Sequence, residues 1–145
     1  MRSYRKRDIR TYSPIIYVAG PYTGRTAEER DAHIHAADMA ARGIALLGLR
    51  LGIMVRVLTP HLNTARWEES ITTEGYFYRV CLDWILDTVD AVYWLGPSPG
   101  ANLERALAEA IGVPVLTTIE EVRAWLLAWR DAMRDQAGRA SSTSP

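Results

Sequence analysis

Glu104 is the residue whose type and spacing best fit a chemical role. The run 98–111 predicts a helix, because Ser98 is a favoured N-cap and Pro99 a favoured first residue. At about 100° per residue, Glu104 lies on the flank of the apolar face beside Leu107, so we expect it to be half buried. The helix dipole stabilises a carboxylate near a helix start as an anion, which is how a nucleophile is prepared. The alternative is a boundary glutamate that only favours the helix start.

The segment 20–25 is a candidate anion-binding loop. Its backbone N–H groups lead into a helix predicted by the capping box Thr26 and Glu29, and helix N-termini attract anions. The G-x-G-x-x-G spacing of dinucleotide-binding loops is absent. The run 23–26 resembles half of a flavodoxin phosphate loop, although Pro21 replaces its first hydroxyl residue. An FMN electron carrier therefore remains an alternative, as does a tight turn followed by a helix cap.

Alternating strands and helices must position these residues. Apolar, β-branched runs predict strands at 14–20, 54–58, 91–95 and 113–117, and helical periodicity predicts helices at 26–51, 76–89, 98–111 and 119–136. This alternation indicates an α/β fold, flavodoxin-like or Rossmann-like, with a parallel sheet in the order 2-1-3-4 and helices on both faces. Ligands of such sheets bind beyond the carboxyl ends of the strands, which selects the loops 20–25, 60–75 and 96–104.

The composition fits one globular domain. The chain has 145 residues, of which 48% are hydrophobic and 23% charged. We expect a basic flexible arm at 1–13, a single domain at 14–137 and a disordered tail at 138–145. Seventeen basic residues balance seventeen acidic ones, so no global field favours nucleic acid or an anionic membrane.

Several kinds of chemistry are disfavoured by residue counts. Lys6 is the only lysine and sits in a polar run, which argues against a Walker-type loop and against Schiff-base catalysis. One cysteine, Cys81, and three histidines at unrelated spacings offer no zinc arrangement and no intrachain disulfide. We therefore expect no metal and no cofactor. The apolar runs are too short or interrupted for a signal peptide or membrane span, so a cytoplasmic protein is expected.

Five short motifs, taken in order, carry a family resemblance. They are Ile16-Tyr-Val-Ala-Gly-Pro-Tyr-Thr-Gly24, Thr59-Pro-His-Leu62, Asp90-Ala-Val, Ser98-Pro-Gly-Ala-Asn-Leu-Glu104 and Gly112-Val-Pro-Val115. Over about residues 14–120 the chain resembles the nucleoside 2-deoxyribosyltransferase-like superfamily. Within it the chain looks closest to an uncharacterised bacterial and phage branch, and more distantly it is similar to the deoxynucleoside 5′-monophosphate N-glycosidases.

The resemblance implies cleavage of an N-glycosidic bond, by hydrolysis or transfer, in a nucleoside or nucleoside 5′-monophosphate. It matches Glu104 to the nucleophile that attacks the anomeric carbon and Tyr17 to a strand tyrosine near that carboxylate. It matches Ser98 and Gly100 to the loop that holds the 5′-phosphate or 5′-hydroxyl, and His61 to a histidine of some monophosphate hydrolases. A carboxylate nucleophile splits one difficult displacement into two easier steps.

Further binding residues are expected around these. Gly20, Gly24 and Arg25 belong to the anion loop, where Arg25 would pair with a phosphate. Aromatic side chains could stack on a base, with Trp67 the most suggestive because it lies in a polar segment. The stacking candidates are Tyr22, Trp67, Tyr76 and Trp94, of which Trp94 is better read as core.

One position departs from the family pattern. Many relatives have an aspartate eight residues before Asp90, but here that residue is Leu82 and the aspartate is Asp83. Asp83 could serve as the catalytic acid, or it could form a solvated i,i+4 ladder with Arg79 and Asp87. Without an acid, the protein would be a non-catalytic nucleotide or nucleotide-sugar sensor. A homodimer or larger oligomer is expected, because superfamily relatives complete their sites across an interface and because the final helix is rich in apolar residues, among them Trp125, Trp129 and Met133.

Overall fold

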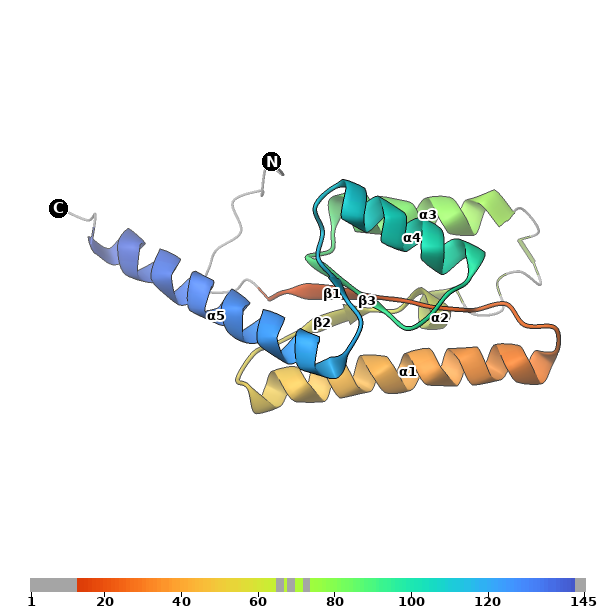
Figure 1. The fold of residues 1–145 in the computed structure, drawn as a ribbon, viewed down its shortest axis with the longest axis horizontal. Helices are drawn as coiled ribbons and strands as arrows, with labels where there is room; N and C mark the ends of the chain where they lie inside the picture. Colours follow the sequence, from red (N-terminus) through yellow and green to blue (C-terminus); the bar gives the residue numbers. More distant parts are fainter. Residues whose placement is uncertain (1–12, 65–66, 68–69, 72–73, 143–145) are drawn as a thin grey trace.

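The computed structural model describes residues 13–64, 67, 70–71 and 74–142, so the predicted basic arm lies outside the described residues except for Ser13. Its four strands form one parallel sheet in the order β2-β1-β3-β4 (Figure 1). The α/β class and the strand order predicted from the sequence are confirmed. The strands are β1 (Ile15–Ala19), β2 (Arg56–Leu58), β3 (Ala91–Trp94) and β4 (Val115–Leu116).

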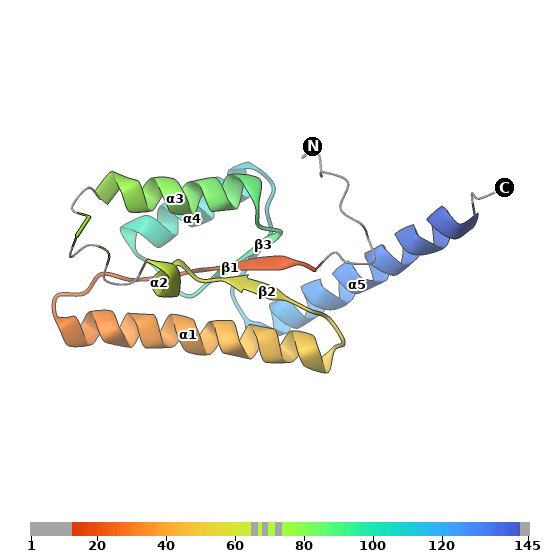
Figure 2. The same ribbon diagram turned by 180° about the vertical axis from the view of Figure 1, so that it is seen from behind.

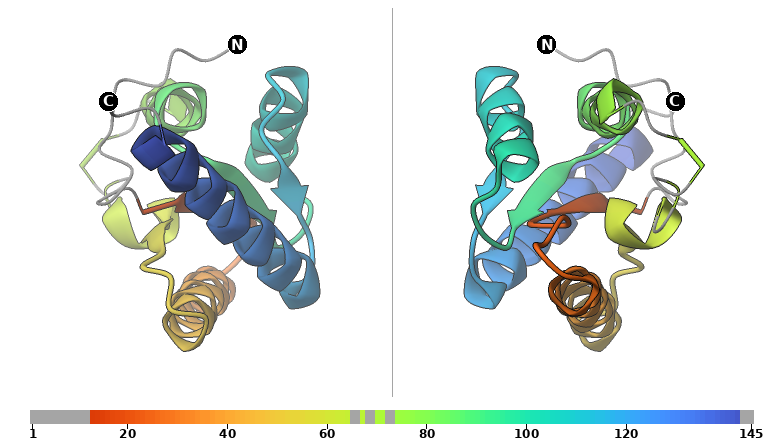
Figure 3. Two further views of the ribbon diagram at one scale, coloured as in Figure 1. Left: turned by 90° about the vertical axis from the view of Figure 1, so that its left-hand side faces the viewer. Right: turned by 90° about the vertical axis from the view of Figure 1, so that its right-hand side faces the viewer.

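Helices cover both faces of this sheet. The helices α1 (Ala27–Arg50) and α5 (Ile119–Ser142) pack on one face, whereas α3 (Glu74–Asp87) and α4 (Pro99–Ala110) pack on the other (Figures 1, 2 and 3). A single turn, α2 (Pro60–Asn63), follows β2 and was not predicted as a helix. None of the helices in the described ranges is both long and apolar enough to cross a bilayer.

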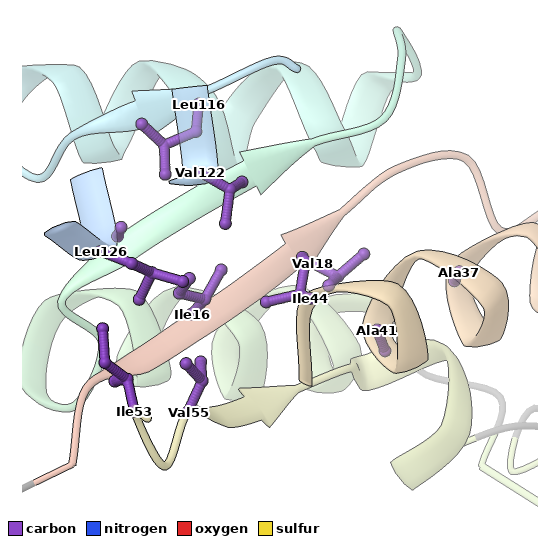
Figure 4. Close-up of a cluster of buried hydrophobic side chains, with 11 residues drawn as sticks. Ile16, Val18, Ala37, Ala41, Ile44, Ile53, Val55, Leu116, Val122 and Leu126 are labelled. Carbon is purple, nitrogen blue, oxygen red and sulfur yellow. The ribbon is translucent and has the colours of Figure 1, made fainter. Parts of the chain in front are cut away.

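The central strand β1 contributes side chains to both halves of the core, one on each face of the sheet. All of its residues are buried, as expected for a parallel strand covered on both faces. Successive side chains alternate, so Ile16 and Val18 join the cluster under α1 and α5 (Figure 4), and Tyr17 joins the cluster under α3 and α4. Tyr17 therefore faces the helix that carries Glu104.

The Thr26 half of the capping box before α1 forms as predicted, whereas Glu29 reaches the residue before the N-cap. Thr26 Oγ1 accepts a hydrogen bond from the Glu29 N–H at 3.1 Å, and a Glu29 carboxylate oxygen accepts one from the Arg25 N–H at 2.6 Å. These bonds hold the segment after β1 in a fixed path into the helix. Gly112, predicted to close the helix before β4, has a φ of 77° and follows the α4 C-cap.

The final helix is longer than predicted. It runs to Ser142, so residues 138–142, expected to belong to a disordered tail, are helical, and residues 143–145 lie outside the described residues. An exposed Gly138 costs a helix only about 1 kcal/mol, which does not end it. The hydroxyls of Ser141 and Ser142 also donate hydrogen bonds to the carbonyls of Gly138 and Arg139, at 2.9 Å each.

The apolar face of α5 is mostly used within the chain. Val122 and Leu126 are buried, and both Trp125 and Trp129 pack against the same core cluster. The far end of the helix extends away from the sheet (Figures 1 and 2) and is exposed on nearly every side. The excess apolar surface expected on α5 is therefore largely absent.

Gly48 allows α1 to approach the chain that returns to β2. A Cβ atom at Gly48 would lie 2.5 Å from Val55 Cγ2 and 2.7 Å from the Ile53 carbonyl oxygen. We expect Gly48→Ala to lower the free energy of unfolding by about 1–3 kcal/mol, because backbone and core must shift. In the same helix Gly43 has nothing within 4 Å of an added Cβ, so Gly43→Ala should raise it by about 0.5–1 kcal/mol. Urea denaturation measures both; equal effects would contradict this packing.

Candidate active site

A cleft of about 840 Å³ opens beyond the carboxyl ends of β1 and β3. Its walls are the segment 20–27, residues of and after α2, one side of α3, and the first turns of α4. The order of the sheet reverses between β1 and β3, which is where parallel α/β folds leave a crevice for ligands. All three loops selected from the sequence contribute to it.

Most of the predicted site residues meet in this cleft. Residues from the anion loop, from α2 and from the start of α4 lie far apart in sequence and share one cavity. Those that line it are Gly20, Tyr22, Gly24, Arg25, His61, Ser98, Gly100 and Glu104.

Tyr17 lies directly behind the cleft. Its hydroxyl donates a hydrogen bond of 2.8 Å to Glu104 Oε1, and both side chains are buried. The two residues are 87 positions apart and come from adjacent layers, β1 and α4. The proximity expected from the family resemblance is therefore present. Because the phenol occupies Oε1, a reaction at this carboxylate would use Oε2.

Glu104 is more buried than expected, and its pKa lies close to neutrality. Its side chain is only 8% exposed, and burial raises its pKa from 4.5 to about 7, although hydrogen bonds from Tyr17 and Cys81 pull in the opposite direction. The helix dipole does not prevent this rise in the pKa. The dipole acts mainly within the first turn, whereas Glu104 lies beyond that turn of α4.

The groups next to Glu104 remain protonated. Burial, and then the neighbouring Glu104, raise the pKa of Tyr17 well above its ordinary value of 10. Burial also raises the pKa of Cys81 to about 11. Both side chains therefore act at neutral pH as neutral hydrogen-bond donors rather than as charged groups.

Asp83 lies outside this arrangement. Its carboxylate accepts a hydrogen bond from Arg79 Nε at 2.9 Å in an i,i+4 pair, in which the Arg79 side chain is 81% exposed. It does not line the cleft, whereas Cys81, two residues earlier on α3, does. The Arg79–Asp83 pair of the expected solvated ladder is therefore present, and the structure does not support Asp83 as a catalytic residue. The rotation of α3 about its axis decides which of its side chains faces the cleft.

His61 joins two walls of the cleft. Its Nε2 lies 2.7 Å from the Pro21 carbonyl oxygen, so Nε2 carries the proton and Nδ1 is an acceptor. Among the described residues Nδ1 has no hydrogen-bond partner. Burial lowers the pKa of His61, which keeps the ring neutral, and the ring packs edge-on against Tyr22 at 5.7 Å.

The start of α4 has a side-chain N-cap at Ser98 and a close contact between Gly100 and Tyr78. Ser98 Oγ accepts a hydrogen bond from the Ala101 N–H at 3.0 Å, which leaves the hydroxyl proton available to a ligand. A Cβ at Gly100 would lie 3.1 Å from a ring carbon of Tyr78, so a larger residue would crowd the cleft wall. This end of the cleft can bind an anion through the helix N-terminus.

The two predicted base-stacking tryptophans lie elsewhere. Trp67 is 44% exposed and does not line the cleft. The sequence could not indicate this, because a residue in a polar segment has no periodic apolar face from which its direction can be read. Trp94 packs against the core under α3 and α4, as the sequence indicated, with the Arg105 guanidinium 4.7 Å above its ring. Tyr76 contacts Phe77 edge-on and is 41% exposed.

Other lining residues were missed by sequence reasoning. Arg30 follows the anion loop by one helical turn, and its i,i+4 spacing from Thr26 was an available signal. Phe77 and Cys81 lie on α3, where apolar periodicity does not distinguish a cleft-facing residue from a core-facing one. The missed residues are Arg30, Thr64, Ile71, Phe77, Tyr78 and Cys81.

Replacing Glu104 by Gln is expected to stabilise the fold at alkaline pH. The raised pKa means that the native state keeps a proton that the unfolded chain releases near its ordinary pKa of 4.5. The free energy of unfolding of the wild type therefore falls by about 3 kcal/mol in total as the pH rises from about 4.5 to about 7. The Gln side chain has no proton to lose, so the variant does not show this fall. Urea denaturation should show the advantage of the variant growing from about pH 4 to about pH 8. The exposed Glu109→Gln gives the control, and an advantage independent of pH would contradict the raised pKa.

Comparison with known proteins gives the chain a family. The family model described as "Domain of unknown function (DUF4406)" matches residues 14–117. This region contains all four strands, the cleft walls, Tyr17 and Glu104. No curated protein matches the chain. The chain belongs to the DUF4406 family.

Proposed function

We propose that this protein cleaves the N-glycosidic bond of a nucleoside or nucleoside 5′-monophosphate, with Glu104 as nucleophile. The observation that carries the proposal is the buried hydrogen bond from Tyr17 to Glu104 Oε1 at the wall of a ligand-sized cleft. A buried carboxyl with a pKa near neutrality is a frequent mark of a reacting group. The sequence resemblance to deoxyribosyltransferase-like enzymes supports the same chemistry.

The reaction would proceed in two displacements. Ionised Glu104 attacks the anomeric carbon through Oε2, the carbon–nitrogen bond breaks, and its electron pair goes to the base, which takes up a proton from water. Water, or a second base in a transfer reaction, then attacks the anomeric carbon, the bond from that carbon to Oε2 breaks and releases the carboxylate, and the proton of the attacking group passes to solvent water. Tyr17 orients Oε1 and stabilises the charge that returns to the carboxylate in the second step.

The cleft offers complementary ends for such a substrate. Ser98 and the N-terminus of α4 suit a 5′-phosphate or 5′-hydroxyl, and the guanidinium groups of Arg25 and Arg30 add positive charge to the wall. The rings of Tyr22 and Tyr78 provide flat apolar surface for a base. The single cysteine, Cys81, is half-buried and leaves the chain without an intrachain disulfide, which supports action in the cytoplasm.

A second candidate is a nucleotide or nucleotide-sugar sensor without catalysis. The observation that favours it is that Glu104 is the only carboxylic acid among the described residues lining the cleft, so no described acid protonates the departing base. Leu82, at the position where relatives have an aspartate, does not line the cleft either. Binding of nucleotides without release of base would select the sensor, and a yellow purified protein would select the flavin alternative.

Glu104→Gln should abolish base release while ligand binding persists. Gln keeps the shape and helix propensity but cannot form the glycosyl-enzyme, so the rate should fall on the order of 10³-fold or more. Nucleosides and monophosphates are incubated with each protein, and free base is measured by chromatography. Glu109→Gln, an exposed change on the same helix, should keep wild-type activity. Near wild-type activity in Glu104→Gln would rule out the nucleophile assignment.

Tyr17→Phe should move the pH dependence of base release upwards. Only ionised Glu104 attacks, so the wild-type rate should rise with pH around the pKa of about 7. The Tyr17 hydrogen bond lowers that pKa, so its removal raises the midpoint of the rate profile. Tyr93→Phe, whose ring packs against the core under α1 and α5, should leave the midpoint unchanged. A rate that falls with pH through 7 would instead make Glu104 a general acid.

A further inference from the structure

The wall of the cleft around α2 contains a buried hydrogen-bond acceptor that lacks a donor. His61 is only 4% exposed, its Nε2–H donates to the Pro21 carbonyl oxygen at 2.7 Å, and its Nδ1 has no hydrogen-bond partner among the described residues. Burial lowers the pKa of this imidazole, so at neutral pH Nδ1 carries no proton and can only accept. A buried acceptor without a donor costs free energy, so a ligand group that donates to Nδ1 would be bound favourably.

The hydroxyl of Thr64 provides a second acceptor beside the first. Its Oγ1 donates its only proton to the Pro60 carbonyl oxygen at 3.1 Å, which leaves the lone pairs of Oγ1 for a ligand. His61 and Thr64 both line the cleft, and they are three residues apart at the turn formed by α2. Residues at this spacing share one side of a helical turn. The α2 wall therefore presents two acceptors close together.

The wall at the start of α4 has the opposite character. The strands β2 and β3 flank β1, so α2, which follows β2, and α4, which follows β3, lie on opposite sides of the cleft. The hydroxyl proton of Ser98 and the N-terminus of α4 make this second wall a donor of hydrogen bonds. Two strand spacings separate the walls, about 10 Å, and a nucleoside is of similar length from its 5′ group to the far edge of its base.

These two walls orient the substrate of the proposed reaction, and the inference rests on that proposed function. With the 5′ group at Ser98 and the anomeric carbon at Glu104, the base leaves the sugar on the side away from Ser98, because the two substituents are attached on either side of the ring oxygen. The base then reaches the α2 wall, where the ring of Tyr22 packs edge-on against His61 with the centroids 5.7 Å apart. Tyr22 can contact the flat face of the base while the edge of the base meets the two acceptors.

We propose that His61 Nδ1 and Thr64 Oγ1 recognise an exocyclic amino group of the base, so that the substrates carry an amino-bearing base such as adenine or cytosine. An amino group has two N–H donors, one for each acceptor. Hypoxanthine, uracil and thymine have no amino group, and their ring N–H can serve one acceptor only while an adjacent carbonyl oxygen faces the lone pairs of the other. The lost hydrogen bond and this repulsion select against the oxo bases.

Matched pairs of nucleotides test this preference for an amino group. Titration calorimetry on the Glu104→Gln variant, which cannot turn over, measures the dissociation constants of 2′-deoxynucleoside 5′-monophosphates. Adenine is compared with hypoxanthine and cytosine with uracil, because the members of each pair differ at one exocyclic position and in the ring proton that follows from it. In at least one pair the amino member should bind on the order of 10- to 100-fold more tightly. Equal affinities in both pairs, or tighter binding of the oxo members, would overturn the proposal.

Side-chain changes in the Glu104→Gln background assign the preference to the two acceptors. His61→Gln keeps a side-chain N–H for the Pro21 carbonyl but lacks the acceptor at Nδ1, so the preference should fall below about 3-fold. Thr64→Val keeps the shape without the hydroxyl and should lower the preference on the order of 3-fold. His35→Gln, an exposed histidine of α1 that does not line the cleft, is the matched control and should keep the preference. A preference that survives both cleft changes, in variants shown by circular dichroism to be folded, would contradict the assignment.

The same titrations separate this inference from the proposed function. If no monophosphate binds, the proposed function fails and the base preference fails with it. If monophosphates bind without regard to the amino group, the base preference alone fails. If the preference is present but the wild type releases no base from the preferred nucleotide, the recognition by the two acceptors is supported and the sensor is selected over the enzyme.

Discussion

The site depends on one constraint, the burial of β1 on both of its faces. A tyrosine in the middle of such a strand is sealed from water, so its hydroxyl needs a partner inside the protein. Tyr17 finds that partner in Glu104, and the bond joins the central strand to the helix that begins at the cleft. The position of the carboxylate is therefore fixed by the core rather than by a loop, as a preorganised reacting group requires.

The same burial determines the charge of the site. A carboxylate at the cleft wall is stabilised by its donors and by the start of α4, but it loses much of its hydration. Burial is the larger effect, so Glu104 titrates near neutrality, while Tyr17 and Cys81 stay neutral beside it. The cationic side chains of Arg25 and Arg30 line the cleft with the anion-binding loop. The side of the cleft at Glu104 therefore carries one carboxyl that titrates near neutral pH beside two neutral side chains, and the side at the anion-binding loop carries positive charge.

Helix α1 has two separate roles, one at its first turn and one along its inner face. Its first turn lines the cleft, where Thr26 and Glu29 fix the preceding loop. Its inner face is made of small and branched residues that pack on β1, and Gly48 permits the return to β2.

The sequence alone determined the four strands, the four long helices, the order of the strands in the sheet and the loops that meet, because hydrophobic periodicity and capping residues are local signals. It did not determine the short helix α2 or the end of α5. The helical wheel also indicated Glu104, and the family resemblance indicated Tyr17 as its partner on the strand. The tertiary structure decided which side chains meet in the cleft and how deeply each is buried. The phase of α3 sent Asp83 to solvent and Cys81 to the cleft, and the packing of α4 buried Glu104 enough to overcome the helix dipole. A helical wheel gives direction but neither depth nor the medium that a side chain meets, and these set its charge and its contacts.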